Sequence, residues 1–78
     1  METKLLNALV AHYQAELQRG EANLICFFKN ASGVGDHPDI IGEMTKLVDT
    51  IAHARMSLQV LNDMVQQEPA QTPAAADD

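Results

Sequence analysis

The sequence predicts an all-α protein that folds as an antiparallel two-helix hairpin resembling a coiled coil. Two long stretches, 2–31 and 37–67, carry apolar or small residues at alternating spacings of four and three. This spacing keeps one stripe of a helix turned toward a partner helix. Between them, 32–36 contains Gly33 and Gly35. Because so short a reversal makes the flanking helices antiparallel, the two stripes are expected to face each other.

The first stretch, 2–31, is predicted to be one helix. Good helix formers such as Ala8, Ala15 and Glu16 occupy much of its outward surface. Asn30 and Ser32 favour a helix end, because their side chains compete for backbone hydrogen bonds. The stripe of this helix consists of Leu6, Val10, Tyr13, Leu17, Gly20, Leu24, Phe27 and Ala31.

The second stretch, 37–67, repeats the same pattern, and no proline interrupts it after Pro38. Its stripe consists of Ile40, Met44, Leu47, Ile51, Ala54, Leu58, Leu61 and Val65. We call the two stripes together the seam, since the hairpin is predicted to close along them.

A single register pairs the two stripes from one end to the other. Folding the chain at the turn places Leu24 opposite Leu47 and Gly20 opposite Ile51, followed by Leu17 opposite Ala54. Small residues therefore face large ones, as interdigitated packing requires. A glycine inside a helix costs about 1 kcal/mol relative to alanine. Close approach of the second helix at Ile51 is the predicted reason for Gly20.

The predicted turn and helix start contain Gly33, Gly35, Asp36, His37, Pro38 and Asp39. The glycines can take positive φ, which a chain reversing over few residues needs. Asp36 is the expected N-cap of the second helix, and Asp39 adds negative charge at its positive end. A proline is tolerated in this first turn, because the first N–H groups have no partner within the helix.

Length and composition predict one small domain, residues 1–67, followed by a flexible acidic Pro/Ala tail, 68–78. The net charge of −6 repels phosphate backbones and anionic membranes, so neither nucleic acid nor membrane is an expected partner. Cys26 is the only cysteine, which excludes an internal disulfide and favours a reducing cytoplasm.

Two pairs of side chains have the spacing of metal ligands on a helix. His12 lies one turn from Glu16, and Asp49 lies one turn from His53. The register turns both pairs outward, where solvated helices with weak ion pairs are the expected outcome. A metal site that joins the four side chains remains an alternative hypothesis.

The remaining candidates for chemistry have simpler structural interpretations. His37 is interpreted as a first-turn residue beside capping acids, with a pH-sensitive role as the alternative. Cys26 is interpreted as a helix residue without the base that a nucleophile needs. Tyr13 lies on the seam, where a ligand contact is the alternative to a core position. Gly33-Val34-Gly35 lacks the strand, lysine and further glycine of a phosphate loop. We therefore predict no catalytic residue, metal or cofactor, and no enzyme.

Apolar residues outside the seam predict a contact surface. Two helices bury only one stripe each, so the other apolar residues would face water in a lone hairpin. We interpret them as an interface for self-association, most simply a dimer that makes a four-helix bundle, with higher oligomers as a further possibility. A monomer with scattered surface apolar residues is the alternative. The predicted interface residues are Leu9, Ile25, Phe28, Ile41, Val48, Ala52, Met56 and Met64.

Three short runs of the sequence are Ala22-Asn23-Leu24, Phe28-Lys29-Asn30 and Gly33-Val34-Gly35-Asp36-His37-Pro38-Asp39-Ile40. Together they resemble small uncharacterised proteins of tailed bacteriophages, notably myoviruses of cyanobacteria. The similarity extends from about Tyr13 to Leu61, and only the turn is specific. This chain departs from the pattern at Ala31-Ser32, where an apolar residue followed by proline is expected. The resemblance implies a phage accessory protein that acts in the host cytoplasm or in the virion, and it supplies no catalytic residues.

Three functions therefore follow as hypotheses. The first is a non-enzymatic hairpin that self-associates and binds a protein of the host or the phage through an apolar helical face. The second is an oligomer that sequesters a small ligand such as a nucleotide signal, which would require Lys29, Lys46 or Arg55 to cluster in one concave pocket. The third is a metal-binding helical bundle.

Overall fold

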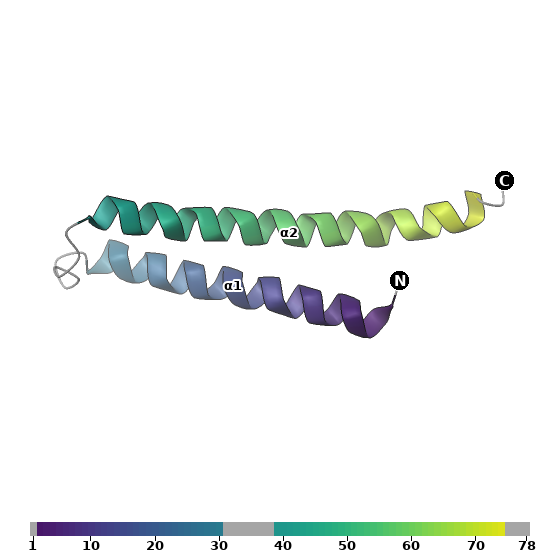
Figure 1. Cartoon of the computed structure of the whole chain (residues 1–78), viewed down its shortest axis with the longest axis horizontal. Helices are drawn as coiled ribbons and strands as arrows, with labels where there is room; N and C mark the ends of the chain where they lie inside the picture. Colours follow the sequence, from purple (N-terminus) through teal and green to yellow (C-terminus); the bar gives the residue numbers. More distant parts are fainter. Residues whose placement is uncertain (1, 31–38, 75–78) are drawn as a thin grey trace.

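The computed structural model describes residues 2–30 and 39–74, with side chains of the second range described as far as Gln67. Helix α1 covers Thr3–Lys29 and helix α2 covers Ile40–Ala74. The two helices lie side by side and antiparallel in an elongated molecule of 61 × 20 × 15 Å (Figure 1). The predicted all-α hairpin is thus confirmed. Residues 31–38, which include Gly33, Gly35, Asp36, His37 and Pro38, lie outside the described residues.

Helix α1 begins at an acidic cap and ends at an asparagine. Oε1 of Glu2 accepts a hydrogen bond from the backbone N–H of Leu5 at 2.8 Å. At the other end, the N–H of Asn30 donates to the carbonyl of Cys26 at 2.9 Å. These bounds lie within two residues of the predicted 2–31, which is the usual uncertainty of a helix end.

Helix α2 is capped by Asp39, and the predicted N-cap, Asp36, lies outside the described residues. Oδ1 of Asp39 accepts from the N–H of Gly42 at 2.9 Å, and its carbonyl accepts from the N–H of Glu43 at 3.1 Å. An N-cap side chain reaches N–H groups two or three positions ahead, so a helix that begins at Ile40 is capped by its immediate predecessor. The predicted start at residue 37 is corrected accordingly.

Gly42 owes its place to this cap. A Cβ atom added to Gly42 would collide with the carboxylate of Asp39, coming within 2.7 Å of its Cγ. Two explanations of this glycine were compatible with the sequence, a close approach of another backbone and a softened first turn. The contact in the structure is local: the missing side chain leaves room for the capping carboxylate.

The end of α2 differs from the sequence prediction. The tail was predicted to begin at residue 68, but α2 continues to Ala74. The helix thus includes Pro69 and Pro73, although a proline inside a helix costs about 3 kcal/mol, more than helix formers such as Ala70 can offset. Residues 75–78 lie outside the described residues.

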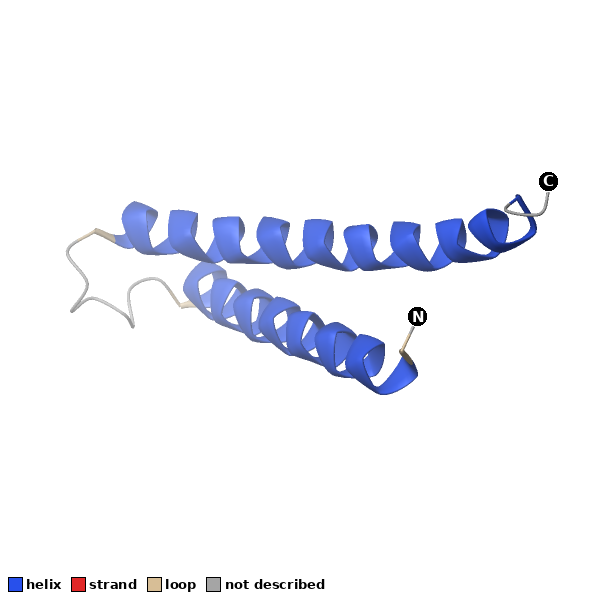
Figure 2. Ribbon diagram, turned by 45° about the vertical axis from the view of Figure 1, so that its right-hand side comes forward, coloured by secondary structure: helices blue, strands red, loops and turns tan. Residues whose placement is uncertain are grey.

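The seam forms in the predicted register. Every described seam residue is buried or half-buried, with Gly20, Ile51 and Ala54 buried. A Cβ atom at Gly20 would lie 3.0 Å from Cγ1 of Ile51, so the two helices meet closely at this pair. From there α1 diverges from α2 toward its N-terminus (Figures 1 and 2). None of the described helices combines the length and the apolar character needed to cross a membrane.

Candidate functional site

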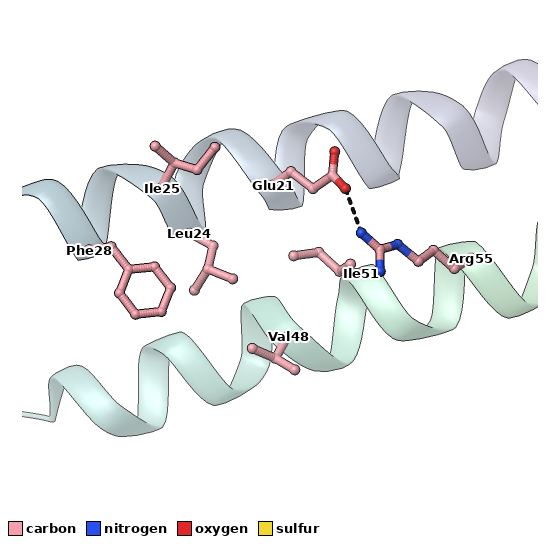
Figure 3. A pocket seen from close by; sticks show the side chains of 7 residues that line it. All are labelled: Glu21, Leu24, Ile25, Phe28, Val48, Ile51 and Arg55. Carbon is pink, nitrogen blue, oxygen red and sulfur yellow. Dashed lines mark hydrogen bonds and ion pairs between the residues drawn. The ribbon is translucent and has the colours of Figure 1, made fainter.

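An apolar groove lies between the helices in the half of the hairpin next to the turn. It has a volume of about 370 Å³ and is open to solvent. Leu24 and Phe28 extend from α1 toward α2, and Ile51 extends from α2 toward α1 (Figure 3). The residues that line the groove are Glu21, Leu24, Ile25, Phe28, Val48, Ile51 and Arg55.

The helical repeat explains why these residues lie together. Leu24 and Ile51 belong to the seam and lie deepest, half-buried and buried respectively. Phe28 follows Leu24 by four residues and Val48 precedes Ile51 by three, so each lies beside the seam on its own helix. Because the helices are antiparallel, these two positions fall on the same side of the hairpin. The seam therefore forms the floor of the groove, and the flanking residues form its walls.

An ion pair between the helices closes one end of the groove. Nη2 of Arg55 donates to Oε2 of Glu21 at 3.0 Å, and the pair joins residues 34 positions apart in the chain (Figure 3). Both side chains are partly exposed, so the pair stabilises the hairpin by no more than about 1 kcal/mol. The carboxylate also offsets part of the positive charge that Arg55 presents to a ligand.

The groove belongs to a longer surface that we call the groove face. In a coiled-coil hairpin, residues seven positions apart lie on the same side of a helix. On α1 the face contains Ile25, Phe28 and the residues at multiples of seven positions from them, and on α2 it contains Ile41, Thr45 and the residues at multiples of seven positions from them. The groove face consists of Lys4, Asn7, Ala11, Gln14, Gln18, Glu21, Ile25, Phe28, Ile41, Thr45, Val48, Ala52, Arg55, Gln59, Asn62 and Gln66.

The groove face carries little charge. Its charged members are Lys4, Glu21 and Arg55, of which the last two pair with each other. Among the acids whose side chains are described, Glu21 alone lies on this face. The other described acids, Glu2, Glu16, Asp39, Glu43, Asp49 and Asp63, lie outside this face.

The structure sorts the predicted interface residues into separate surfaces. All eight are exposed. Ile25, Phe28 and Val48 line the groove, and Ile41 and Ala52 lie on the same face. The rest lie elsewhere: by the same steps of seven, Leu9 and Met64 fall on the opposite flank near the open end, and Met56 falls on the side away from the seam.

Two further exposed apolar residues extend the patch on the opposite flank. Leu5 is 68% exposed and precedes Leu9 by one helical turn, and Val60 is 50% exposed and precedes Met64 by one turn. The spacing of Leu5 and Leu9 was visible in the sequence and could have placed Leu5 among the predicted interface residues.

The opposite flank also carries a row of aromatic rings. The ring of Tyr13 lies 4.9 Å from that of His12 and 6.1 Å from that of His53, both in edge-to-face geometry. Tyr13 is half-buried on the seam, so its ring joins the two histidines across the helices. His12 lies 3.8 Å from Glu16, the spacing of a weak surface ion pair when the histidine is protonated.

The described side chains do not assemble a metal site. Between residues 2–30 and 39–67, no three His, Cys, Asp or Glu side chains are placed to hold one ion. The rings of His12 and His53 both lie near that of Tyr13, whereas Asp49 falls on the outward side of α2. Cys26 is an exposed free thiol.

The positive side chains do not gather in the groove of the described chain. Arg55 is the one cation in its lining, and it pairs with Glu21. Lys46 pairs instead with Glu43 at 3.4 Å on the opposite flank. The clustering of cations that a nucleotide-binding pocket requires is therefore not formed within the described part of one copy.

Comparisons with known proteins found no match among protein-family models, curated proteins or solved structures. Function is therefore argued from the geometry of the hairpin.

Proposed function

We propose that this chain is a non-enzymatic accessory protein of phage type that self-associates and binds a protein partner through apolar helical faces. The observation that carries the proposal is the contrast between core and surface. Among the described residues, the buried hydrophobic side chains are Ile51, at 9% exposure, and Ala54, whereas large apolar side chains are exposed on both flanks of the hairpin.

This contrast has an energetic consequence. A chain of this size rarely obtains more than about 3–5 kcal/mol from its own core. Burial of apolar surface contributes about 25 cal/mol per Å² to stability. The exposed apolar faces of the hairpin contribute none of this free energy while they remain in water. Contact with another protein surface would bury these faces and gain that free energy, which supports binding as the function.

The binding of a protein is favoured over the binding of a nucleotide by the character of the groove. Its lining is apolar except for Glu21 and Arg55, which neutralise each other. The carboxylate of Glu21 lies 3.0 Å from the guanidinium and would repel an anionic ligand that approached Arg55. An apolar side chain of a partner can enter without that repulsion.

Light scattering and thermal unfolding over a wide range of protein concentration test self-association. We expect a mass of at least twice the 8.5 kDa of one chain, and a melting temperature that rises with concentration because association stabilises the folded state. A mass of one chain and a constant melting temperature at high concentration would contradict this part of the proposal.

Binding of a second protein is tested by co-precipitation from infected or expressing cells. A partner identified with the wild-type chain should be lost on Leu9→Glu, which places a charge in the exposed apolar patch of the opposite flank. The matched control is Ala15→Glu, since Ala15 is exposed on the side of α1 away from the seam. Equal loss with both variants would argue against an apolar contact.

A further inference from the structure

We propose that the occupant of the groove face is a second copy of this chain, related by a two-fold axis, with Phe28 of each copy seated in the groove of the other. The inference rests on the self-association in the proposed function, and it assigns that association to one face. The opposite flank, with Leu5, Leu9 and Met64, is thereby left free for the other protein partner.

The groove face carries both halves of a self-complementary contact. In a two-fold interface the same surface is used by both copies, so it must present a projection and a recess together. Phe28 is 71% exposed, so most of its ring is accessible to a partner although it extends along one wall of the groove (Figure 3). The recess is the groove of about 370 Å³, and Ile41, which is 73% exposed, lies on the same face outside the groove lining. An exposed ring beside an apolar recess is what each copy needs in order to receive the other.

Charge favours a second copy on this face over any other face. Two identical chains of net charge −6 repel each other wherever their acids approach. On the groove face the single described acid, Glu21, is already paired with Arg55 within its own chain. The other charged residue of this face, Lys4, lies near the N-terminus and outside the groove lining, so two copies can meet around the groove without bringing unpaired like charges together. The opposite flank carries more charge, with Glu16 beside His12 and Glu43 beside Lys46, and two copies meeting there would have to bring these groups close together.

The exposed apolar residues of the groove face supply a large part of the area that a stable dimer buries. Ile25, Phe28, Ile41 and Val48 are each exposed by about half or more. An aromatic side chain carries roughly 150–250 Å², and with somewhat smaller areas for isoleucine and valine these four expose on the order of 400 Å² in one copy. Two copies would bury about 800 Å² from these residues alone, and the uncharged polar side chains around them would raise the total toward the roughly 1,200–2,000 Å² of stable interfaces.

A pair of charge insertions tests the assignment. Phe28→Glu places a carboxylate in the groove face, and Met64→Glu places one at a similarly exposed apolar position on the opposite flank. Light scattering should show that Phe28→Glu weakens dimerisation by roughly a hundredfold or more, as for a central interface residue, whereas Met64→Glu leaves it within a few-fold of wild type. Circular dichroism at the same concentrations reports whether each variant remains helical.

A second measurement uses small substitutions that preserve the fold. In a Cys26→Ser background, Ala52→Cys reports on the groove face and Ala22→Cys on the outward side of α1; both alanines are exposed. The rate of maleimide labelling at Ala52→Cys should fall at least several-fold when the concentration is raised through the dimerisation range. The rate at Ala22→Cys should stay constant.

The outcomes separate this inference from the proposed function. Loss of the dimer in Phe28→Glu together with protection at Ala52→Cys supports the assignment. A wild-type dimer that survives Phe28→Glu, or leaves Ala52→Cys unprotected, overturns the assignment while self-association stands. A monomeric wild-type chain overturns both.

Discussion

The middle of the seam and its open end are built from the same heptad pattern, yet they pack differently. In the middle, Gly20, Ile51 and Ala54 are buried. Toward the open end, Leu6 and Leu61 are larger than Gly20 or Ala54 but only half-buried. The difference lies in the small residues: a glycine or alanine lets the opposite helix approach, whereas two large residues hold the helices apart and leave their own sides exposed.

The comparison shows that a heptad pattern identifies which residues face the partner helix but not how deeply each of them is buried. Only the layers of Gly20 with Ile51 and of Leu17 with Ala54 place a small residue opposite a large one in the described part of the seam. Two helices alone can complete a core at these layers. Elsewhere along the hairpin, a third surface is needed to cover the seam.

The largest effect is expected for Gly20→Leu. A Cβ atom at this position already lies 3.0 Å from Cγ1 of Ile51, so a leucine would push the helices apart at their closest point. We expect the free energy of unfolding to fall by about 3 kcal/mol or more. Denaturant unfolding at fixed protein concentration measures the loss. The control, Ala22→Leu, lies on the outward side of α1 and should change stability by less than about 0.5 kcal/mol. Equal stability of Gly20→Leu and wild type would refute the close approach.

A smaller effect is expected for Ile51→Ala, compared directly with Leu61→Ala. Both substitutions remove the same number of carbon atoms, one from the buried middle and one from the half-buried open end. The loss should be about 2 kcal/mol at Ile51 and about 1 kcal/mol at Leu61, because the lost transfer free energy scales with the area removed from water. If Leu61→Ala costs as much as Ile51→Ala, the seam is uniformly buried and the comparison fails.

The smallest effect concerns the cap at the turn end. In an Asp39→Ala background, Gly42→Ala should stabilise α2 by about 0.5–1 kcal/mol, because alanine is the better helix former. In the wild-type background this gain should vanish, since the new Cβ displaces the Asp39 carboxylate from its hydrogen bond. Thermal unfolding of the four variants gives the coupling between the two positions. An equal gain in both backgrounds would show that the cap does not depend on Gly42.

The seam was fully predictable from the sequence because it depends on periodicity alone. The helical repeat fixes which residues share a side, and the short turn fixes the register, so Gly20 could be matched with Ile51 before any coordinates. The same reasoning placed Phe28 and Ile41 together beside the seam near the turn. These predictions needed no knowledge of side-chain conformation.

Other features depend on local choices that periodicity does not report. Asp36 and Asp39 are equally good capping residues, and only the observed start at Ile40 selects Asp39. The groove could not be predicted, because it depends on how Phe28 and Val48 are placed beside Leu24 and Ile51, and on the contact between Glu21 and Arg55. The end of α2 lies beyond the predicted residue 67, past Pro69 and Pro73, and the helix propensities of the surrounding residues do not explain this.

The Glu21–Arg55 pair also bears on ionic strength. At ionic strengths of about 0.1–0.15 M, salt screens interactions between exposed charges more than about 8–10 Å apart. Added salt therefore weakens an association of opposite charges and strengthens an association of like charges. Glu21 and Arg55 form their ion pair within one chain, and the residues around them on the groove face are largely uncharged. An association through the groove face would therefore respond weakly to added salt, whereas an association through the more acidic sides of the hairpin would depend on the ionic strength.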